Sequence, residues 1–505
     1  MNKIYSNDQI KKKIESLKFK KKKIGLSHGV FDLIHLGHIR HFKEAKNRCD
    51  VLIVSVTSDK FVNKGPGRPR FNQSERMESL AGLECVDYVI LSNNLSAENN
   101  ITLIKPNFYF KGPDYKNSKD DITGKIKKEN KLVKFYGGKT VYTSSKKYSS
   151  TLILNNFEKD NSTKDKLKIQ VKKKFSLVEI KQLIDQLKKV KPLVIGEIII
   201  DEYNFCEALG KSGKEPMLVV RDLFSEYYLG GSGAIANHLS GFNDKVNLIS
   251  YIGEKKDRFE FIKKKLNKNI KFTYIKKLNS PTILKKRFID EIAKSKILGI
   301  YRLNDAYINI KEEKDLINKF NFISKFIDLI ILSDYGHGLI TEKLIKNIKK
   351  KSKFIAANAQ INAANIGHHS LNNYKGVDLM MMNEKELRHE MRSRNETVHN
   401  LMKKLCEIIK VKYLVVTRGS SGCILYNKKE LKFYYSNAYS NKIIDKVGAG
   451  DAMLSILSIC IFKKFDLNLA LLISSFCAAQ SVQTIGNKAS INKSLLLKDL
   501  EHYLT

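Results

Sequence analysis

Apolar and polar residues follow one another along this chain in patterns that predict strands and helices in turn. In the first third, apolar runs of buried-strand type cover residues 24–26, 51–56, 86–91 and 107–110. Between them the spacing is helical, with Ile39, Phe42 and Ala45 on one face and further helices near 72–80 and 97–104. This alternation predicts a parallel, doubly wound sheet, whose ligands bind beyond the carboxyl ends of the strands.

A second α/β pattern begins after a stretch that is poor in apolar residues. Residues 158–174 are rich in Lys, Asp, Asn and Ser, as is typical of a linker, and Ser176 then begins a helix. An apolar strand follows at 192–201, and two apolar helices at 453–462 and 469–479 are too short to span a bilayer. We expect three parts: an N-terminal domain at 1–157, a linker and connecting helix at 158–190, and a C-terminal α/β domain at 191–505.

The net charge of +39 raises the question of nucleic-acid binding. The lysines are spread along the whole chain among Asn and Ile, without aromatic or Gly-Arg interleaving, so we interpret the charge as background that helps to capture phosphorylated substrates. A lysine-rich nucleic-acid-binding protein on an enzyme fold stays an alternative. The seven cysteines form no C-x-x-C pair, and no secretion signal precedes the first strand, so we expect a cytoplasmic protein without a membrane span.

The segment Ser27–Arg40 carries the first candidate chemistry. Its apolar strand enters a Gly-containing turn, and His35 and His38 stand where a helix begins. Unpaired N–H groups at a helix N-terminus attract phosphate, the imidazoles add donors, and Gly37 leaves room between them for a bulky anion. The segment therefore predicts a nucleoside-triphosphate site that stabilises charge on phosphate oxygens during nucleotidyl transfer.

This segment resembles the HxGH signature of the nucleotidyltransferase superfamily, in its cytidylyltransferase-like branch. Class I aminoacyl-tRNA synthetases share a related signature, but the short first domain and the missing Lys-Met-Ser-Lys-Ser-like loop disfavour them. Segments 111–115 and 149–151 extend the resemblance to the adenylyltransferase domain of bacterial bifunctional heptose-phosphate kinase/adenylyltransferases, over residues 22–157. It implies catalytic roles for His35 and His38, and nucleotide contacts for Gly29, Phe31, Lys46, Arg76, Lys111, Ser150 and Thr151.

Nucleotidyl transfer of this kind needs no covalent nucleophile. A sugar 1-phosphate oxygen attacks the α-phosphorus of ATP (CTP stays open) in line, and pyrophosphate leaves. The protein positions the reactants and, together with Mg²⁺, stabilises the developing charge. Lys46 and Arg76 could contribute to this, or could be solvated surface cations.

The segment Asp445–Met453 carries the second candidate chemistry. Gly448 and Gly450 let successive N–H groups form an anion-binding nest, and the following helix directs its positive end to the same place. Asp451 would then lie beside a transferring phosphate, where it can accept a proton from a hydroxyl group.

This segment resembles the D-x-x-G-A-G-D signature of the ribokinase/PfkB sugar kinases, and the match covers residues 191–492. Residues 333–338 resemble the S-D-Y-x-x-G strand end of heptose-phosphate kinases. The resemblance implies Asp451 as the catalytic base and Glu386 as an indirect Mg²⁺ contact. It implies nucleotide contacts for Asn383, Glu384, Lys385, Glu386, Thr417, Gly419, Gly422, Gly448, Ala449 and Gly450, and sugar contacts for Asp201, Gly230, Gly231 and Asn237.

Two departures from the family pattern concern substrate and phosphate contacts. Ala234 and Ile235 stand where a sugar-binding asparagine usually follows the diglycine turn, and 358–360 reads Asn-Ala-Gln instead of Asp-Pro-Lys. The order of the two domains is also reversed relative to the common heptose enzyme. Lid-like strands are expected within 204–228 and 281–303, and because such an exposed layer is a liability if left unpaired, we expect a homodimer through this lid.

The patterns together predict a bifunctional enzyme of nucleotide-sugar synthesis. The C-terminal domain would phosphorylate a sugar phosphate, for which heptose 7-phosphate at its anomeric hydroxyl is the expected substrate, and the N-terminal domain would attach a nucleotide to a sugar 1-phosphate. ADP-activated heptose for envelope lipopolysaccharide is the expected product, and CDP- or ADP-activated forms of another sugar are the next alternatives. The same-class alternative is that only one domain is active and that the other has become a scaffold or sensor.

Overall fold

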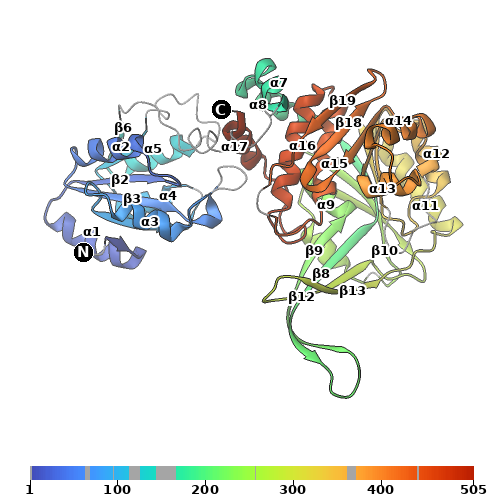
Figure 1. Cartoon of the computed structure of the whole chain (residues 1–505), viewed down its shortest axis with the longest axis horizontal. Helices are drawn as coiled ribbons and strands as arrows, with labels where there is room; N and C mark the ends of the chain where they lie inside the picture. Colours follow the sequence, from blue (N-terminus) through green and yellow to red (C-terminus); the bar gives the residue numbers. More distant parts are fainter. Residues whose placement is uncertain are drawn as a thin grey trace. The chain divides into compact units, whose positions relative to one another are not determined.

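The computed structural model describes residues 3–62, 69–94, 96–112, 125–143, 166–255, 257–360, 371–440 and 443–504. The chain forms two compact units (Figure 1). Unit 1 comprises Met1–Lys166 with Leu497–Thr505, and unit 2 comprises Leu167–Leu496.

Unit 1 contains a six-stranded sheet in which all neighbours are parallel, in the order β1-β4-β3-β2-β5-β6. Its strands are β1 (Ile4–Tyr5), β2 (Ile24–Gly29), β3 (Val51–Thr57), β4 (Tyr88–Ser92), β5 (Phe108–Lys111) and β6 (Lys139–Tyr142). Its helices are α1 (Asn7–Phe19), α2 (Leu36–Lys46), α3 (Gln73–Ala81), α4 (Glu98–Ile104) and α5 (Lys125–Phe135). This arrangement confirms the predicted parallel sheet.

Helices cover both faces of this sheet, as a doubly wound fold requires. Apolar residues of α1, α4 and α5, such as Ile10, Ile101 and Val133, form one core cluster. Residues of α2 and α3, such as Phe42 and Leu80, form the other. The strands between these clusters are buried on both sides, which explains why β3 reads as a continuous apolar run.

Unit 2 is built on a nine-stranded sheet in the order β11-β10-β7-β14-β15-β16-β17-β18-β19. Only the pairs β17–β18 and β18–β19 are antiparallel. The strands are β7 (Pro192–Gly196), β10 (Val246–Gly253), β11 (Ile270–Lys277), β14 (Leu329–Asp334), β15 (Ile355–Ala359), β16 (Leu379–Asn383), β17 (Tyr413–Thr417), β18 (Cys423–Asn427) and β19 (Lys432–Ser436).

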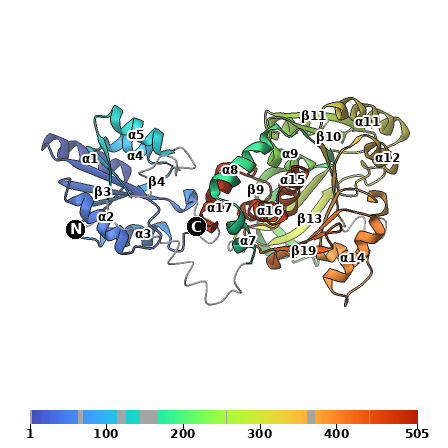
Figure 2. The same cartoon turned by 90° about the horizontal axis from the view of Figure 1, so that it is seen from above.

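Helices lie on both faces of the nine-stranded sheet, as Figure 2 shows. One core cluster joins the sheet to α11 (Ile310–Ile323), α12 (Glu342–Lys351), α13 (Glu384–Glu390) and α14 (Val398–Ile409). On the opposite side α15 (Ala449–Phe462) packs against α9 (Ser232–Ser240), α16 (Leu467–Ser481) and strand β14. The remaining α-helices of the described residues are α7 (Lys166–Lys174), α8 (Leu177–Gln186), α10 (Phe259–Lys265) and α17 (Lys493–Leu504), of which α17 begins in unit 2 and ends in unit 1.

A separate four-stranded sheet, which we call the lid, has the order β13-β12-β8-β9. Its strands are β8 (Ile198–Lys211), β9 (Leu218–Gly231), β12 (Leu284–Asp290) and β13 (Lys296–Arg302). The β8–β9 hairpin projects from the unit (Figure 1), and apolar side chains near its tip, such as Leu209 and Met217, are exposed. The predicted lid strands are therefore present: β12 and β13 lie within the expected range 281–303, whereas β8 and β9 extend beyond the expected range 204–228.

Two sequence expectations about local structure were wrong. The run 192–201 is not one strand, because the chain leaves β7 for the lid strand β8 at Glu197, whose side chain accepts backbone N–H bonds from elsewhere in the unit. The expected linker is partly helical: Lys166–Lys174 forms α7, with Leu167 and Val171 buried. Across the described ranges, no helix is both long enough and apolar enough to cross a membrane.

Candidate active sites

In unit 1 the two predicted histidines lie together at the start of α2. His35 is the N-cap residue, and its Nδ1 accepts a hydrogen bond from the Gly37 backbone N–H at 3.1 Å. The rings of His35 and His38 stack with their centroids 3.9 Å apart. Because Nδ1 of His35 accepts, the neutral ring carries its proton on Nε2 and can donate from that atom. The imidazole rings are therefore the donors that this helix start offers to an anionic ligand, because the Gly37, His38 and Ile39 backbone N–H groups already bond to His35.

The loop before these histidines is shaped by Gly29 and Phe31. Phe31 is buried and has a φ of +50°, a conformation that is rare for an aromatic residue. A Cβ atom at Gly29 would lie 2.9 Å from the Phe31 ring, so the ring needs a glycine there. The Phe31 ring also meets His38 edge to face, with centroids 5.4 Å apart. These two residues hold the loop, and their contact with a nucleotide stays a prediction.

Lys46 and Arg76 occupy structural positions that do not support the predicted phosphate contacts. Lys46 Nζ forms an ion pair with Asp87 at 2.6 Å and donates to the Asp50 carbonyl at 2.7 Å. Arg76 is only 1% exposed, and its guanidinium donates to three backbone carbonyls and to Asp59. Arg76 is therefore not the solvated surface cation of the alternative: it joins α3 to the ends of β2 and β3, and its contact with phosphate stays a prediction.

Lys111 ends β5, where the sequence placed it, and it is buried beside an acidic partner. Its Nζ lies 3.1 Å from Glu129, which also accepts hydrogen bonds from Tyr109 and from the Ala97 backbone. Burial opposes ionisation of Glu129, but Lys111 and the Ala97 N–H outweigh it and lower its pKa. Lys111 is thus part of a charged pair at the carboxyl edge of the sheet. Ser150 and Thr151 lie outside the described residues.

His41 is a residue of this region that the sequence analysis missed. Its Nε2 lies 2.9 Å from Ser27 Oγ, and its Nδ1 lies 2.9 Å from Thr143 Oγ1, so it connects β2 to the end of β6. Burial lowers its pKa to about 4. A lone histidine on a helix gave no signal of this role, because its two hydrogen-bond partners, Ser27 and Thr143, come close to it only in the folded protein.

In unit 2 the glycine-rich segment forms the expected turn into α15. Gly448 is the N-cap with a φ of +88°, and a Cβ there would lie 2.1 Å from Asn487 Oδ1, so glycine is required. Ala449 and Gly450 open the helix, and Asp451 lies in its first turn. The structure therefore brings the predicted nest and the predicted base to one place.

Asp451 is held by a tyrosine whose role the sequence did not reveal. Tyr335 is buried and donates its hydroxyl to Asp451 Oδ1 at 2.7 Å. Burial raises the pKa of Asp451 to about 7, the Tyr335 hydrogen bond opposes this rise, and Asp201 adds to it. A carboxylate with a pKa near neutrality is suited to accept a proton from a hydroxyl group.

Glu197, at the junction of β7 and β8, fixes the position of Tyr335. Its two carboxyl oxygens accept the backbone N–H groups of Tyr335 at 3.0 Å and of Leu339 at 3.2 Å. The side chain is fully buried, and burial together with the nearby Asp334 raises its pKa to about 7. The junction between β7 and β8, where the predicted single strand 192–201 is interrupted, therefore also positions the tyrosine that holds Asp451, the predicted base.

The predicted sugar-binding residues Asp201, Gly230 and Gly231 come together where β8 and β9 meet. Asp201 forms an ion pair with Arg287 of β12, and a Cβ on Gly230 would lie 2.3 Å from Asp201 Oδ2. Asn237 is engaged elsewhere, since its amide donates to the Lys265 carbonyl and accepts from the Asn267 backbone N–H, both at 3.0 Å. The predicted sugar contact of Asn237 is therefore not supported by its position.

The predicted nucleotide segments meet at the carboxyl edge of the sheet. Asn383 and Thr417 are register partners on the neighbouring parallel strands β16 and β17. The spacing of Asn383 and Glu386 also has a local explanation, because the two residues form a reciprocal capping box at the start of α13. The Asn383 N–H donates to the Glu386 carboxylate at 2.7 Å, and the Glu386 N–H donates to the Asn383 side chain at 2.8 Å. Glu384 pairs with Arg418 at 2.8 Å, which ties the two segments together.

Lys385 follows Glu384 in α13, and Gly419 and Gly422 lie in the turn after β17. Both glycines have positive φ, and a Cβ on Gly422 would lie 1.9 Å from the Ser436 carbonyl oxygen. This turn therefore depends on glycine. Contact of these three residues with a nucleotide stays a prediction.

Asp445, the first residue of the glycine-rich segment, connects that segment to the lid. It accepts a hydrogen bond from Tyr203 of β8 at 2.6 Å and pairs with Lys296 of β13 at 2.7 Å. Burial opposes its ionisation, but Lys296 and Tyr203 outweigh burial and lower the pKa of Asp445. The sequence pattern placed Asp445 in the motif but gave no indication of these lid partners.

Asp451, the glycine-rich helix start and the lid sheet are the features that the sequence led us to expect of an α/β phosphotransferase. The chain belongs to the pfkB family of carbohydrate kinases, because the model of that family matches residues 191–494. Residues 26–156 match the model of the cytidylyltransferase-like family.

Curated relatives named "Bifunctional protein HldE" are similar to parts of the chain. The protein from Campylobacter jejuni (strain RM1221) is 28% identical over 303 residues, which cover 59% of this chain and 62% of the relative. The protein from Aliarcobacter butzleri is 39% identical over 164 residues, or 31% of this chain and 34% of the relative. The chain thus spans less than two thirds of the length of these relatives.

Among solved structures, phosphofructokinase-2 from Escherichia coli in complex with potassium matches with a TM-score of 0.50. The two are 14% identical, and the match covers 62% of this chain and 99% of that protein. At this identity the likeness establishes the fold of the C-terminal unit.

Proposed function

We propose that the chain is a bifunctional enzyme of nucleotide-sugar synthesis. The C-terminal unit transfers the γ-phosphoryl group of ATP to the anomeric hydroxyl of a sugar phosphate, for which heptose 7-phosphate is the proposed substrate. The N-terminal unit joins a sugar 1-phosphate to the nucleotide of ATP or CTP and releases pyrophosphate. The two family matches and the similarity to relatives that are themselves named bifunctional support this proposal.

The observation that carries the kinase half is the placement of Asp451. Its carboxylate lies in the first turn of α15, beside the Gly448–Gly450 nest, and Tyr335 holds it there. In the proposed step Asp451 accepts the proton of the sugar hydroxyl while that oxygen bonds to the γ-phosphorus and the bond to ADP breaks. The backbone N–H groups of the nest and of the helix start hold the transferring phosphoryl group.

The chemistry of the kinase calls for Mg²⁺ bound with the nucleotide, and the residues present fit this mode of binding. Mg²⁺ is usually held by one or two carboxylates together with substrate phosphates and water. Over the described residues no group of three or more His, Cys, Asp or Glu side chains forms a closed metal cage. Glu386, fixed by its capping box, is the proposed contact through water, and the ion would neutralise charge on the phosphate oxygens.

The nucleotidyl-transfer half rests on the start of α2. His35 and His38 stack there, so both rings can donate to the phosphates of one nucleotide, and the positive end of the helix dipole favours the same anion. In the proposed step a sugar 1-phosphate oxygen bonds to the α-phosphorus as the bond to pyrophosphate breaks. The donors stabilise the charge that moves onto the leaving group.

We also propose a homodimer that forms through the lid, in the cytoplasm. The exposed apolar side chains of the β8–β9 hairpin favour a partner on this layer. All seven cysteines are free thiols, which fits a reducing compartment.

One experiment tests both halves. The purified protein is given ATP or CTP and a panel of sugar 7-phosphates and 1-phosphates, and ADP and pyrophosphate are measured separately. We expect Asp451→Asn to abolish ADP formation alone and His38→Ala to abolish pyrophosphate release alone. Asp315→Asn and His399→Ala, on other surfaces of unit 2, are the matched controls. Loss of both reactions in either variant would contradict the assignment of two sites.

A further inference from the structure

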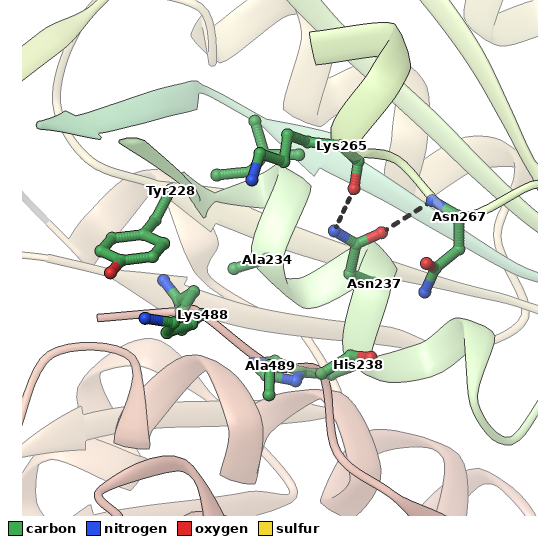
Figure 3. A pocket seen from close by; sticks show the side chains of 11 residues that line it. Tyr228, Ala234, Asn237, His238, Lys265, Asn267, Lys488 and Ala489 are labelled. Carbon is green, nitrogen blue, oxygen red and sulfur yellow. Dashed lines mark hydrogen bonds between the residues drawn. The ribbon is translucent and has the colours of Figure 1, made fainter. Parts of the chain in front are cut away.

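A small cavity lies in unit 2 between α9, the end of β9, the loop after α10 and the segment that follows α16. Its volume is about 130 Å³, well above the about 10–15 Å³ that one water molecule needs. Figure 3 shows its lining, with Ala234 among the other labelled side chains. The residues on which the argument rests are Tyr228, Ala234, His238, Lys265, Asn487 and Lys488.

His238 presents a buried donor at this cavity. It is 1% exposed, and its Nδ1 accepts the Ile491 backbone N–H at 3.2 Å. The proton of the neutral ring is therefore on Nε2, and among the described residues this atom has no hydrogen-bond partner. Burial also lowers the pKa of His238 to about 4, which keeps the ring neutral. A buried donor without a partner is costly, and because His238 lines the cavity, an acceptor bound there is one way to satisfy it.

The charges around the cavity favour an anionic acceptor. Lys265 and Lys488 both line it, and none of the lining residues is acidic. Glu226, which lies outside the lining, pairs with Lys488 at 3.2 Å and so neutralises part of this charge. The amide of Asn237 holds the end of α10, where Lys265 lies, and the loop at Asn267, through the two hydrogen bonds drawn in Figure 3.

The cavity touches both parts of the proposed kinase site. Tyr228 and Leu229 line it directly before Gly230, and Asn487 lines it while lying against Gly448 of the nest. Ala234 lines it as well, at the position where the family resemblance led us to expect a larger, sugar-binding asparagine. The small side chain therefore contributes to the open volume.

We propose that this cavity is a subsite for a phosphoryl group. Such a group matches the surroundings because its oxygens accept from the His238 Nε2–H and from both ammonium groups. The group is either the distal phosphate of the sugar substrate or free phosphate that acts as an effector. The first source rests on the proposed kinase function, and the subsite itself does not.

The test uses the full chain and the double variant Lys265→Gln/Lys488→Gln. Lys264→Gln, which removes an exposed charge from the same helix α10 but not from the cavity, is the matched control. Binding of inorganic phosphate is measured by calorimetry. In parallel, ADP formation gives the ratio of kcat/KM for a sugar phosphate to that for the same sugar without its phosphate.

We expect the double variant to weaken phosphate binding about tenfold, as loss of charge-assisted hydrogen bonds does, while Lys264→Gln does not. If the kcat/KM ratio falls by a similar factor, the phosphoryl group belongs to the substrate, and if the ratio is unchanged, it is free phosphate. Equal phosphate binding and equal ratios in all three proteins would overturn the subsite. If no sugar is phosphorylated while phosphate binding still depends on the two lysines, the proposed kinase function fails and the subsite stands.

Discussion

Replacing Tyr335 by phenylalanine removes the hydroxyl group that donates to Asp451 and keeps the aromatic ring that fills the space. That hydroxyl donates to Asp451 Oδ1 at 2.7 Å, and it opposes the burial that raises the pKa of Asp451 to about 7. The ionised carboxylate is the better acceptor, so loss of the donor favours the protonated form. We therefore expect the pKa of Asp451 to rise further in Tyr335→Phe.

The size of this rise follows from the strength of the hydrogen bond. A hydrogen bond to a charged group contributes about 1.5–3 kcal/mol, and one pKa unit corresponds to about 1.4 kcal/mol, so the pKa should rise by about one to two units. Asp451 accepts a proton only when it is ionised, so kinase activity increases as the pH rises through this pKa. At pH 7 the ionised fraction should fall from about one half to between about one tenth and one hundredth.

The assay is the pH dependence of kcat/KM for ADP formation in Tyr335→Phe and in the unaltered protein. We expect the acidic limb of the profile to move to higher pH by the same one to two units, while activity is recovered at alkaline pH. The charged neighbours Asp201 and Lys285 act on Asp451 in both proteins. Glu197 has a raised pKa of about 7 as well, but it is present in both proteins, so the difference between the two pH profiles measures the effect of the Tyr335 hydroxyl.

Tyr435→Phe is the matched control, because the Tyr435 hydroxyl contacts His399 at 2.9 Å on another part of unit 2. Thermal unfolding of both variants checks that the fold is retained. An acidic limb that stays in place in Tyr335→Phe, with activity at pH 7 equal to that of the control, would refute the role assigned to this hydrogen bond.

Three further predictions concern stability. Arg76→Ala should destabilise unit 1 by about 3–5 kcal/mol in urea unfolding, because it leaves buried carbonyl groups and a carboxylate without their donor. Gly231→Ala should lower the melting temperature and abolish ADP formation, since glycine has a φ of +59° there and a Cβ would lie 2.4 Å from the Glu197 carbonyl oxygen. Unit 1 should lose stability as the pH falls from 6.5 to 4, because the folded state holds the pKa of His41 at about 4 and protonation favours the unfolded chain; His41→Asn should remove this part of the pH dependence.

Each of these has an outcome that would contradict it. Urea midpoints for Arg76→Ala that equal those of an exposed variant such as Arg48→Ala would show that the buried guanidinium contributes nothing net. Full kinase activity in Gly231→Ala would mean that this turn tolerates a side chain. An identical pH dependence of unfolding in His41→Asn would assign the acid sensitivity to other groups.

Much of the fold could be predicted from the chain because local signals agreed with the tertiary arrangement. The continuous apolar run at β3 and the capping residues Asn72 and Ser176 mark elements that the structure contains. Gly448 and Asp451 also lie at a helix start, as the sequence indicated, since glycine suits the positive φ of the N-cap and the apolar run that follows is long enough for a helix; their roles as nest and base stay predictions. Where the local pattern competed with a distant partner, as at Glu197, the prediction of one continuous strand failed.

The sequence by itself determined which segments are strands and helices and which short motifs could carry phosphate chemistry, because these depend on neighbours within a few residues. Only the tertiary structure decided which side chains meet. It placed Tyr335 on Asp451 across 116 positions, buried Arg76 among backbone carbonyls, and formed the cavity at His238 from four separate segments. Such contacts depend on sheet order and burial, which create hydrogen-bond partners and shift pKa values between residues that are remote in the chain.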